Sequence, residues 1–316
     1  TLIEETEVKT NITNKNFTWN TSITLSHNKN SVKKLTGEDV QLWEANFGYS
    51  QNTHIIGVNQ PLGQMYGYVT DGLYQVSDFD YDAATKTYTL KDGVPYAGEK
   101  GNVKPGMWKF KNIDGSKDNK ITEADKTVIG NAYPKIYGGI NNTFTYKDFD
   151  LSIFLTYSIG NDVFNATKLT NTKTALQNKN VLAVADSKHR WVLVNKAGDL
   201  ITDPQEMADI NKGKTVAAIY DNEAGDTYIH SWAVEDGSFL KLSNITLGYT
   251  FPKKMIRKVG LSKLRLYATG SNLLTWTKYS GFDPEVSTMG NGLTPGVDFG
   301  AYPRSRSFVF GINLAF

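Results

Sequence analysis

The chain has 316 residues, of which 40% are hydrophobic and 12% aromatic, and this is enough for one large β domain or two ordinary ones. Its formal net charge is +2, and no basic stripe with interleaved aromatic residues occurs, so nucleic acid is not an expected partner. The absence of cysteine excludes disulfides, thiolate catalysis and Cys-ligated zinc or iron–sulfur sites.

The first predicted elements are two strands, residues 7–12 and 17–27, joined by a turn at residues 13–16. A side-chain period of two places Phe17, Trp19, Ile23 and Leu25 on one face of the second strand. Gly- and Tyr-rich segments such as GQMYGYVTDGLYQ follow. Over the whole chain the pattern predicts about nine or ten strands.

A second hairpin is predicted at residues 137–146 and 149–157. Only Lys147 and Asp148 join its strands, and the aromatic residues Tyr146 and Phe149 flank this turn. Roughly eighty residues precede the next strand, which is far more than a compact soluble domain usually places in one connection.

The last three predicted strands are residues 239–251, 264–274 and 307–316. The final strand, SFVFGINLAF, places apolar side chains on one face and small or polar ones on the other, and it ends on Phe316. A one-sided apolar strand with an aromatic last residue is typical of the closing strand of an outer-membrane β-barrel. We therefore expect Phe308, Phe310, Leu247 and Leu151 to face lipid.

The connections alternate between short and long, as they do in outer-membrane barrels, which pair short periplasmic turns with long extracellular loops. This alternation predicts that Lys147 and residues 253–258 lie in the periplasm. Residues 158–238 and 275–302 are expected outside the cell. No run of apolar residues has the length of a spanning helix, and none is expected in such a fold.

A candidate calcium loop occupies residues 114–125, DGSKDNKITEAD, whose spacing matches an EF-hand or dockerin loop. Its expected ligands, at positions one, three, five, seven and twelve, are Asp114, Ser116, Asp118, the carbonyl of Lys120, and Asp125. Asn119 stands in place of Gly at position six, where a left-handed turn residue is needed. Ser replaces an acidic or amide residue at position three, and Asp replaces a bidentate Glu at position twelve. Each change weakens binding, and a polar loop with Asx turns and a helix cap is the alternative.

Other candidate residues carry weaker signals. Asp283 and Glu285 in GFDPEV are candidates for the acid and base of a glycosidase. Their spacing in the sequence does not define the distance between the two carboxyl groups that this chemistry requires, so a structural role in a loop is favoured. Four scattered histidines have no metal-type spacing and are expected in loops or at the surface: His27, His54, His189 and His230. Six aromatic residues could line a substrate path, although packing is favoured for each: Trp43, Tyr66, Tyr68, Tyr74, Trp191 and Trp232.

In four stretches the chain resembles the carboxy-terminal part of the SusC/RagA family of TonB-dependent outer-membrane transporters. They are residues 63–75, residues 120–165, residues 236–286 and the Phe-terminated last strand. The resemblance implies a large barrel with an amino-terminal plug, covered by a SusD-like surface lipoprotein and energised through TonB. The plug and the TonB box have no counterpart in residues 1–316.

The expected fold is therefore an all-β, antiparallel transmembrane β-barrel segment that forms a curved partial wall of a larger barrel in the bacterial outer membrane. The expected function is import of an oligosaccharide or oligopeptide as the barrel part of a SusCD-like complex, with no enzymatic activity. Calcium is the one candidate cofactor. Its expected partners are the SusD-like lipoprotein, TonB through the missing amino-terminal part, and the remainder of the barrel. A secreted, soluble all-β glycan-binding protein is the alternative, because its strands would show the same alternation.

Overall fold

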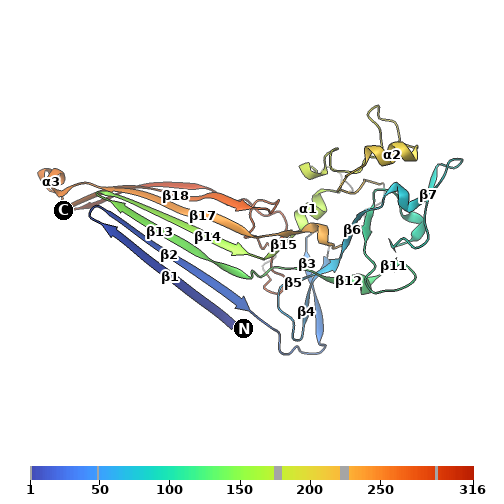
Figure 1. Cartoon of the computed structure of the whole chain (residues 1–316), viewed down its shortest axis with the longest axis horizontal. Coiled ribbons are helices and arrows are strands. Elements are labelled where there is room, and N and C mark those ends of the chain that lie inside the picture. The colour runs from blue at the N-terminus through green and yellow to red at the C-terminus, as the bar shows by residue number, and fades with distance from the viewer. Residues whose placement is uncertain (1, 48–49, 174–179, 221–227, 289–290) are drawn as a thin grey trace.

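The computed structural model describes residues 2–47, 50–173, 180–220, 228–288 and 291–316. It divides into an extended antiparallel sheet, here called the wall, and a lobe of short strands and helices at one end of it, here called the loop region (Figure 1). No helix in the described ranges is both long and apolar enough to cross a membrane.

The wall has seven long antiparallel strands among the described residues, in the order β1-β2-β13-β14-β17-β18-β20. Their bounds are β1 Leu2–Asn14, β2 Phe17–Lys29, β13 Ile136–Tyr146, β14 Phe149–Ile159, β17 Phe239–Thr250, β18 Lys263–Thr277 and β20 Ser307–Ala315. Each of the strands predicted from the sequence is present, and β1 extends five residues further towards the amino terminus than predicted.

One face of the wall is apolar across its whole width. A single row of paired positions crosses all seven strands: Ile12, Trp19, Phe144, Leu151, Leu247, Ala268 and Phe310. Phe310 is 80% exposed and Leu247 is 52% exposed, so the described chain leaves this face uncovered. Large exposed apolar patches mark contact with a membrane or a partner.

The opposite face is polar. The neighbouring row of paired positions is Asn11, Asn20, Thr143, Ser152, Thr246, Thr269 and Val309. This arrangement, apolar outside and polar inside with a period of two, is that of a transmembrane barrel wall. From Leu240 to Tyr249 strand β17 has a length of about 30 Å. At a tilt of about 40° this length spans about 23 Å along the membrane normal, which matches the height of the apolar band of an outer-membrane barrel.

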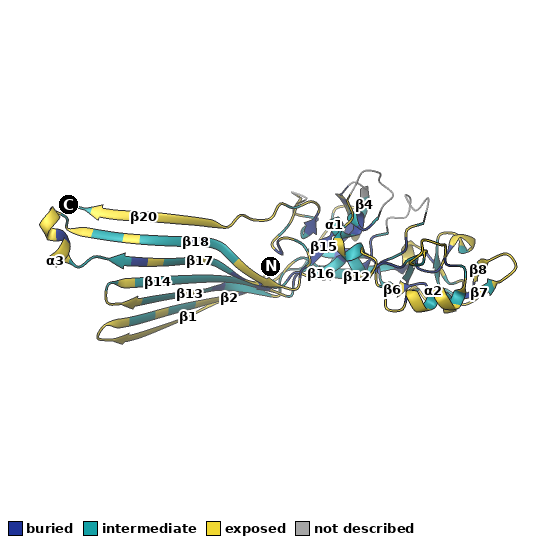
Figure 2. Ribbon diagram, turned by 90° about the horizontal axis from the view of Figure 1, so that it is seen from above, coloured by how far each residue is buried: buried dark blue, intermediate teal, exposed yellow. Residues whose placement is uncertain are grey.

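The wall does not close on itself. Among the described residues, β1 and β20 are the two edges of the sheet and each pairs with one neighbour (Figure 2). Unpaired backbone groups cannot remain in hydrocarbon, so both edges need further strands. The expectation of a curved partial wall is confirmed.

Three short connections lie together at the end of the wall away from the loop region, and the first of them is residues 15–16 between β1 and β2 (Figure 1). The turn between β13 and β14 consists of Lys147 and Asp148, and Lys147 adopts a left-handed conformation with φ 52°. Between β17 and β18 the chain forms helix α3, Lys253–Ile256, and a 3-10 turn, Arg257–Val259, ended by Gly260 at φ 76°. The residue that ends a helical turn commonly adopts the left-handed conformation. Glycine is suited to this position because it adopts that conformation without strain.

The loop region contains thirteen short strands among the described residues, in five small sheets. The four-stranded sheet consists of β12 Lys126–Asn131, β5 Gln64–Tyr68, β4 Ser50–Gly57 and β3 Val40–Asn46. The three-stranded sheet consists of β16 Val234–Asp236, β15 Asp162–Asn165 and β19 Val297–Asp298. The pairs are β10 Trp108–Phe110 with β6 Thr70–Leu73, β11 Lys120–Ile121 with β9 Tyr96–Ala97, and β7 Phe79–Asp82 with β8 Thr87–Leu90. The longer helices are α1 Ala166–Asn171 and α2 Pro204–Ile210.

The predicted total of about nine or ten strands is wrong, because the described chain holds seven wall strands and thirteen loop strands. Strands of two to four residues are too short to show a side-chain period, so the sequence pattern misses them. The segment GQMYGYVTDGLYQ lies in the loop region, where it forms β5 and β6.

The buried hydrophobic residues gather mainly in the loop region. The largest cluster joins β3, β5, β15, α1 and β19 through Ala45, Met65, Phe164, Leu169 and Val297. Since the loop region has a core of its own, it can hold side chains in fixed positions at the end of the wall.

Candidate ligand pocket in the loop region

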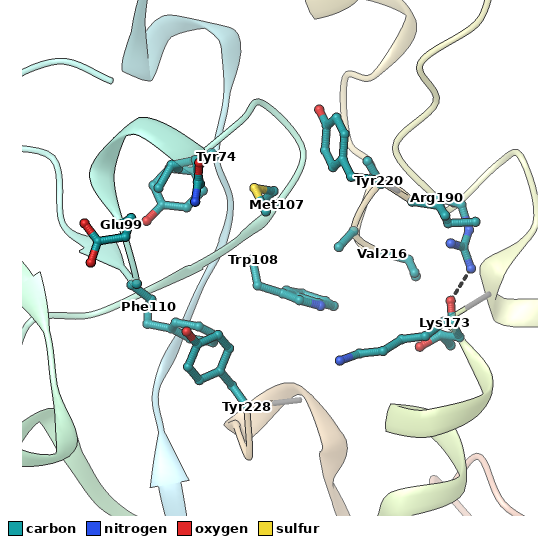
Figure 3. Close-up of a pocket in the computed structure, with 18 residues that line it drawn as sticks. Tyr74, Glu99, Met107, Trp108, Phe110, Lys173, Arg190, Val216, Tyr220 and Tyr228 are labelled. Carbon is teal, nitrogen blue, oxygen red and sulfur yellow. Dashed lines mark hydrogen bonds between the residues drawn. The ribbon is translucent and has the colours of Figure 1, made fainter. Parts of the chain in front are cut away.

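A pocket of about 130 Å³ lies inside the loop region, between segments that are far apart in the sequence (Figure 3). One side comes from the chain around β9 and β10, and the other from residues 172–173, Arg190 and residues 216–220. Tyr74 and Tyr228 also line it, so the pocket exists only when six separate stretches of the chain fold together.

Backbone hydrogen bonds fix the first side. Two backbone hydrogen bonds join Tyr74 to the turn before β10. The Tyr74 N–H donates to Met107 O at 2.9 Å, and the Gly106 N–H donates to Tyr74 O at 2.8 Å. The Tyr74 hydroxyl donates to Pro95 O at 2.7 Å. Burial, and the nearby Asp78 carboxylate, raise the pKa of Tyr74 above its usual range. This tyrosine is therefore a neutral, fixed part of the pocket.

Packed aromatic rings line the bottom of the pocket. Phe110 and Tyr228 meet edge to face at 5.2 Å between ring centroids, and Tyr68 packs on both from behind. Trp108 lies 4.8 Å from the rings of His230 and Trp232. Such contacts stabilise rings in one orientation, so the apolar surface is preformed.

The second side is tied to the first. The Ala218 N–H donates to Gly106 O at 2.9 Å, and the Tyr220 hydroxyl donates to Pro105 O. The Arg190 guanidinium is buried and donates to Thr172 O and, at 3.1 Å, to Ala185 O. The hydroxyl of Tyr220 and these two donors of Arg190 are therefore used within the protein.

Charges of both signs border the pocket. Glu99 lies on one side, whereas Lys173 and Arg190 lie on the other, and the Lys173 side chain extends towards Trp108 and Tyr228 (Figure 3). Burial of the ring lowers the pKa of His230 to about 3, and the positive charges of Lys173 and Lys168 lower it further. The arrangement suits binding of a small apolar group beside charges.

The candidate calcium loop is ordered around Asp125, which is fully buried. Its Oδ1 accepts from the backbone N–H groups of Ile113 at 2.8 Å and Asp114 at 3.2 Å, and its Oδ2 accepts from Thr122 N at 2.8 Å. Three backbone donors stabilise the carboxylate without a metal. This is the hydrogen-bonding pattern of the polar-loop alternative.

The other predicted ligands lie at the exposed side of this loop. Asp114 Oδ1 accepts from Ser116 N at 2.7 Å, and the Ser116 hydroxyl donates to Asp118 Oδ1 at 2.9 Å. Asn119 has φ 56°, the left-handed conformation expected at position six. Within the described residues no group of three or more His, Asp or Glu side chains is arranged to hold a metal. Calcium at Asp114, Ser116, Asp118, Lys120 and Asp125 stays a prediction.

Asp283 and Glu285 belong to a four-charge cluster with Lys241 and Arg304. Lys241 contacts Glu285 directly and lies 3.7 Å from Asp283, while Arg304 Nε lies 2.9 Å from Asp283. The side chains of Lys241 and Asp283 are only 5% and 9% exposed. Two cations therefore neutralise the two carboxylates and fix the loop after β18 onto β17, which is a structural role.

The histidines were expected in loops or at the surface, and this is wrong for His54, which is a buried residue of strand β4; His230 lies in a loop but is buried too. His54 is fully buried, with Nε2 at 2.9 Å from Pro295 O and Nδ1 at 2.8 Å from Thr53 Oγ1. Burial lowers its pKa to about 4. His54 and His230 thus act as neutral packing groups, which a single sequence does not distinguish from surface histidines.

Of the six aromatic residues considered for a substrate path, only Tyr74 lines the pocket. Trp191 is 1% exposed and its ring covers Gly106, while Tyr68 is 5% exposed and donates to Glu123. The pocket also contains Trp108, Phe110 and Val216, which were not among the residues predicted from the sequence. No sequence signal marks them, because the pocket depends on contacts between distant segments.

The geometry defines a class of protein: part of a transmembrane β-barrel wall with an elaborate loop region at one end. Comparison with known proteins agrees. The chain is 32% identical over 313 residues to TonB-dependent receptor P3 of Formosa agariphila, a match that covers 97% of this chain and 27% of that receptor. It is 27% identical to TonB-dependent receptor SusC of Bacteroides thetaiotaomicron, covering 96% of this chain and 25% of SusC. No family model matches the chain.

Among solved structures, the RagAB peptide importer in its open-open state matches 99% of this chain with a TM-score of 0.66, at 19% identity and 28% coverage of that chain. The closed-closed state matches with a TM-score of 0.64 at 21% identity. Over nearly its whole length the chain is therefore similar to TonB-dependent receptors, SusC among them, and it spans about a quarter of the length of these curated relatives. The recognition made from the sequence is confirmed.

Proposed function

We propose that this chain is the barrel part of a TonB-dependent importer that admits an oligosaccharide or oligopeptide across the outer membrane. The observation that carries the proposal is the wall, with an apolar row and a polar row on opposite faces of the same seven strands. A protein wall of this kind separates lipid from a polar passage. The relatives support the proposal because they are TonB-dependent receptors.

The polar face leads to a second, more open cavity of about 420 Å³ where the wall meets the loop region. Tyr137 and Thr156 of the wall and Glu285 of the loop after β18 are among its lining residues. In the proposed importer this cavity is part of the passage. The loop region lies on the outside of the cell, and the short turns at Lys147 and residues 253–258 lie in the periplasm.

The proposed partners follow from the relatives and from the open edges. A SusD-like lipoprotein covers the outer side, as the similarity to SusC and RagAB suggests, and TonB acts through a part of the transporter outside residues 1–316. The free edges of β1 and β20 pair with the remainder of the same barrel. Calcium binding by the loop at residues 114–125 is a separate proposal, supported by its ligand spacing and by the left-handed Asn119.

Uptake by intact cells tests the import function. Cells that carry the full-length transporter, with and without functional TonB, are given labelled oligosaccharides and labelled oligopeptides. We expect one class of compound to enter only when the transporter and TonB are both present. Entry that is independent of both would contradict the proposal.

The alternative of a soluble glycan-binding protein predicts a second layer over the apolar row, as in a sandwich. The described residues place no such layer on it, and Phe310 and Leu247 are exposed. An enzyme with Asp283 and Glu285 as its acid and base is disfavoured by their ion pairs with Lys241 and Arg304. A screen for glycan and peptide cleavage by the purified transporter tests this reading directly.

A further inference from the structure

We infer that the loop-region pocket holds an apolar side chain of a peptide cargo, so that oligopeptides and not oligosaccharides are the substrate class of this transporter. The inference rests on the import function proposed above. It draws on three properties of the pocket: its size, the engagement of its polar groups, and the charges at its border.

The size suits one ring or one branched aliphatic side chain. The pocket has a volume of about 130 Å³, and an apolar protein cavity of about 150 Å³ accommodates a benzene molecule. A hexose ring with its hydroxyl groups is larger than benzene, and an oligosaccharide presents several such rings. A peptide can insert a single side chain while its backbone stays outside.

The polar groups inside the pocket are largely engaged. The hydroxyls of Tyr74 and Tyr220 donate to Pro95 O and Pro105 O, and Arg190 donates to two backbone carbonyls. A sugar hydroxyl that enters an apolar pocket without new partners loses its hydrogen bonds to water, which weakens binding. An apolar side chain loses none and gains contact with Trp108 and Phe110.

The charges at the border match those of a peptide. Glu99 and Lys173 lie on opposite sides of the pocket (Figure 3). A short peptide carries an ammonium group, which can lie near the exposed carboxylate of Glu99. A neutral oligosaccharide has no use for either charge.

The test uses the full-length transporter purified with its lipoprotein, and two synthetic pentapeptides that differ only in a central Phe or Gly. A neutral and an acidic oligosaccharide of similar length serve as the competing class. We expect the Phe peptide to bind at least ~10-fold more tightly than the Gly peptide, because it alone buries an aromatic side chain. Equal binding of the two peptides would overturn the inference.

Filling the pocket provides the decisive variant. Ala217 lines the pocket, and Ala217→Phe should abolish the preference for the Phe peptide, whereas Ala83→Phe, at an exposed position in the same region, should leave it unchanged. If Ala217→Phe weakens oligosaccharide binding instead, the substrate class is wrong. If it releases the lipoprotein and leaves the peptide preference intact, the pocket holds a side chain of the partner and the inference fails.

Glu99→Gln supplies a test that does not depend on packing, because Glu99 is exposed. We expect this variant to remove the difference in affinity between peptides with a free and an acetylated amino terminus. A difference that persists in Glu99→Gln would contradict the role of this charge. TonB-dependent uptake of oligosaccharides alone would refute the peptide class and leave the import function standing, whereas uptake of neither class would refute the import function itself.

Discussion

Arg265 on β18 binds Asp150 on β14 through two hydrogen bonds, Nε to Oδ1 at 3.0 Å and Nη2 to Oδ2 at 2.5 Å. Strand β17 runs between these two strands, so the ion pair passes over it at Gly248. A Cβ atom at Gly248 would lie 2.4 Å from Arg265 Nη2 and 2.5 Å from Asp150 Oδ1. The glycine therefore allows a bidentate ion pair to link three strands on the polar face.

Replacing this glycine should disturb the wall. We expect Gly248→Ala to lower the free energy of unfolding by about 1–3 kcal/mol, because the new methyl group overlaps the ion pair. The measurement is denaturant unfolding of the refolded full-length transporter, followed by its shift in gel mobility. Gly101→Ala is the control, since a Cβ there meets nothing within 4 Å, and equal effects of the two substitutions would contradict the argument.

The two faces of β20 should respond differently to charge. Phe310→Arg places a guanidinium on the apolar face and should destabilise the folded barrel by about 2–4 kcal/mol near the middle of the bilayer. Val309→Arg, one residue away on the polar face, should have a much smaller effect. The check is the amount of folded transporter in the outer membrane. Equal loss for both variants would mean that the assigned orientation of the strand is wrong.

The four-charge cluster should hold the loop after β18 in place. Lys241→Met removes a buried cation and leaves Asp283 and Glu285 with Arg304 alone, which should cost about 3–5 kcal/mol of local stability. Hydrogen exchange of residues 278–288 in the full-length transporter measures this change. Lys278→Met is the control because Lys278 is exposed, and unchanged protection in Lys241→Met would show that the cluster is not needed.

The loop region should lose stability in acid because of its buried histidines. The folded-state pKa values of His54 and His230 are about 4 and about 3, below the ordinary value of 6.5. The unfolded chain therefore binds more protons, and stability is lost as the pH falls from 6.5 towards the folded values. Thermal unfolding at pH 7 and pH 4.5 should show a smaller pH dependence in His54→Gln than in the native protein, whereas His189→Gln, an exposed site, should behave like the native protein.

Calcium should order the outer part of the loop at residues 114–125. We expect millimolar calcium to slow hydrogen exchange at Ser116 and Asp118, and the combined substitutions Asp114→Ala and Asp118→Ala to abolish that effect while the wall stays folded. Magnesium at the same concentration is the control. Identical hydrogen-exchange rates at Ser116 and Asp118 with and without calcium would contradict calcium binding. The segment would then be a polar loop stabilised by the hydrogen bonds of Asp125.

The sequence alone determined the wall and its two faces. Alternation over nine to fifteen residues is long enough to reveal a period of two, so β2, β13, β14, β17, β18 and β20 were predicted with small errors at their ends. The spacing of Asp114, Ser116 and Asp118 likewise suggested a loop whose left-handed residue, Asn119, occurs where it was expected.

Tertiary structure alone decided the pocket and the state of the charged groups. Trp108, Arg190 and Val216 come from segments whose approach depends on packing between distant residues, which no local pattern encodes. Burial distinguishes His54 and His230 from the exposed His189, and the approach of Lys241 and Arg304 turns Asp283 and Glu285 into an ion-pair cluster. The physical reason is that periodicity reports which face of a strand is apolar, whereas solvation and charge pairing depend on which chain segment lies opposite.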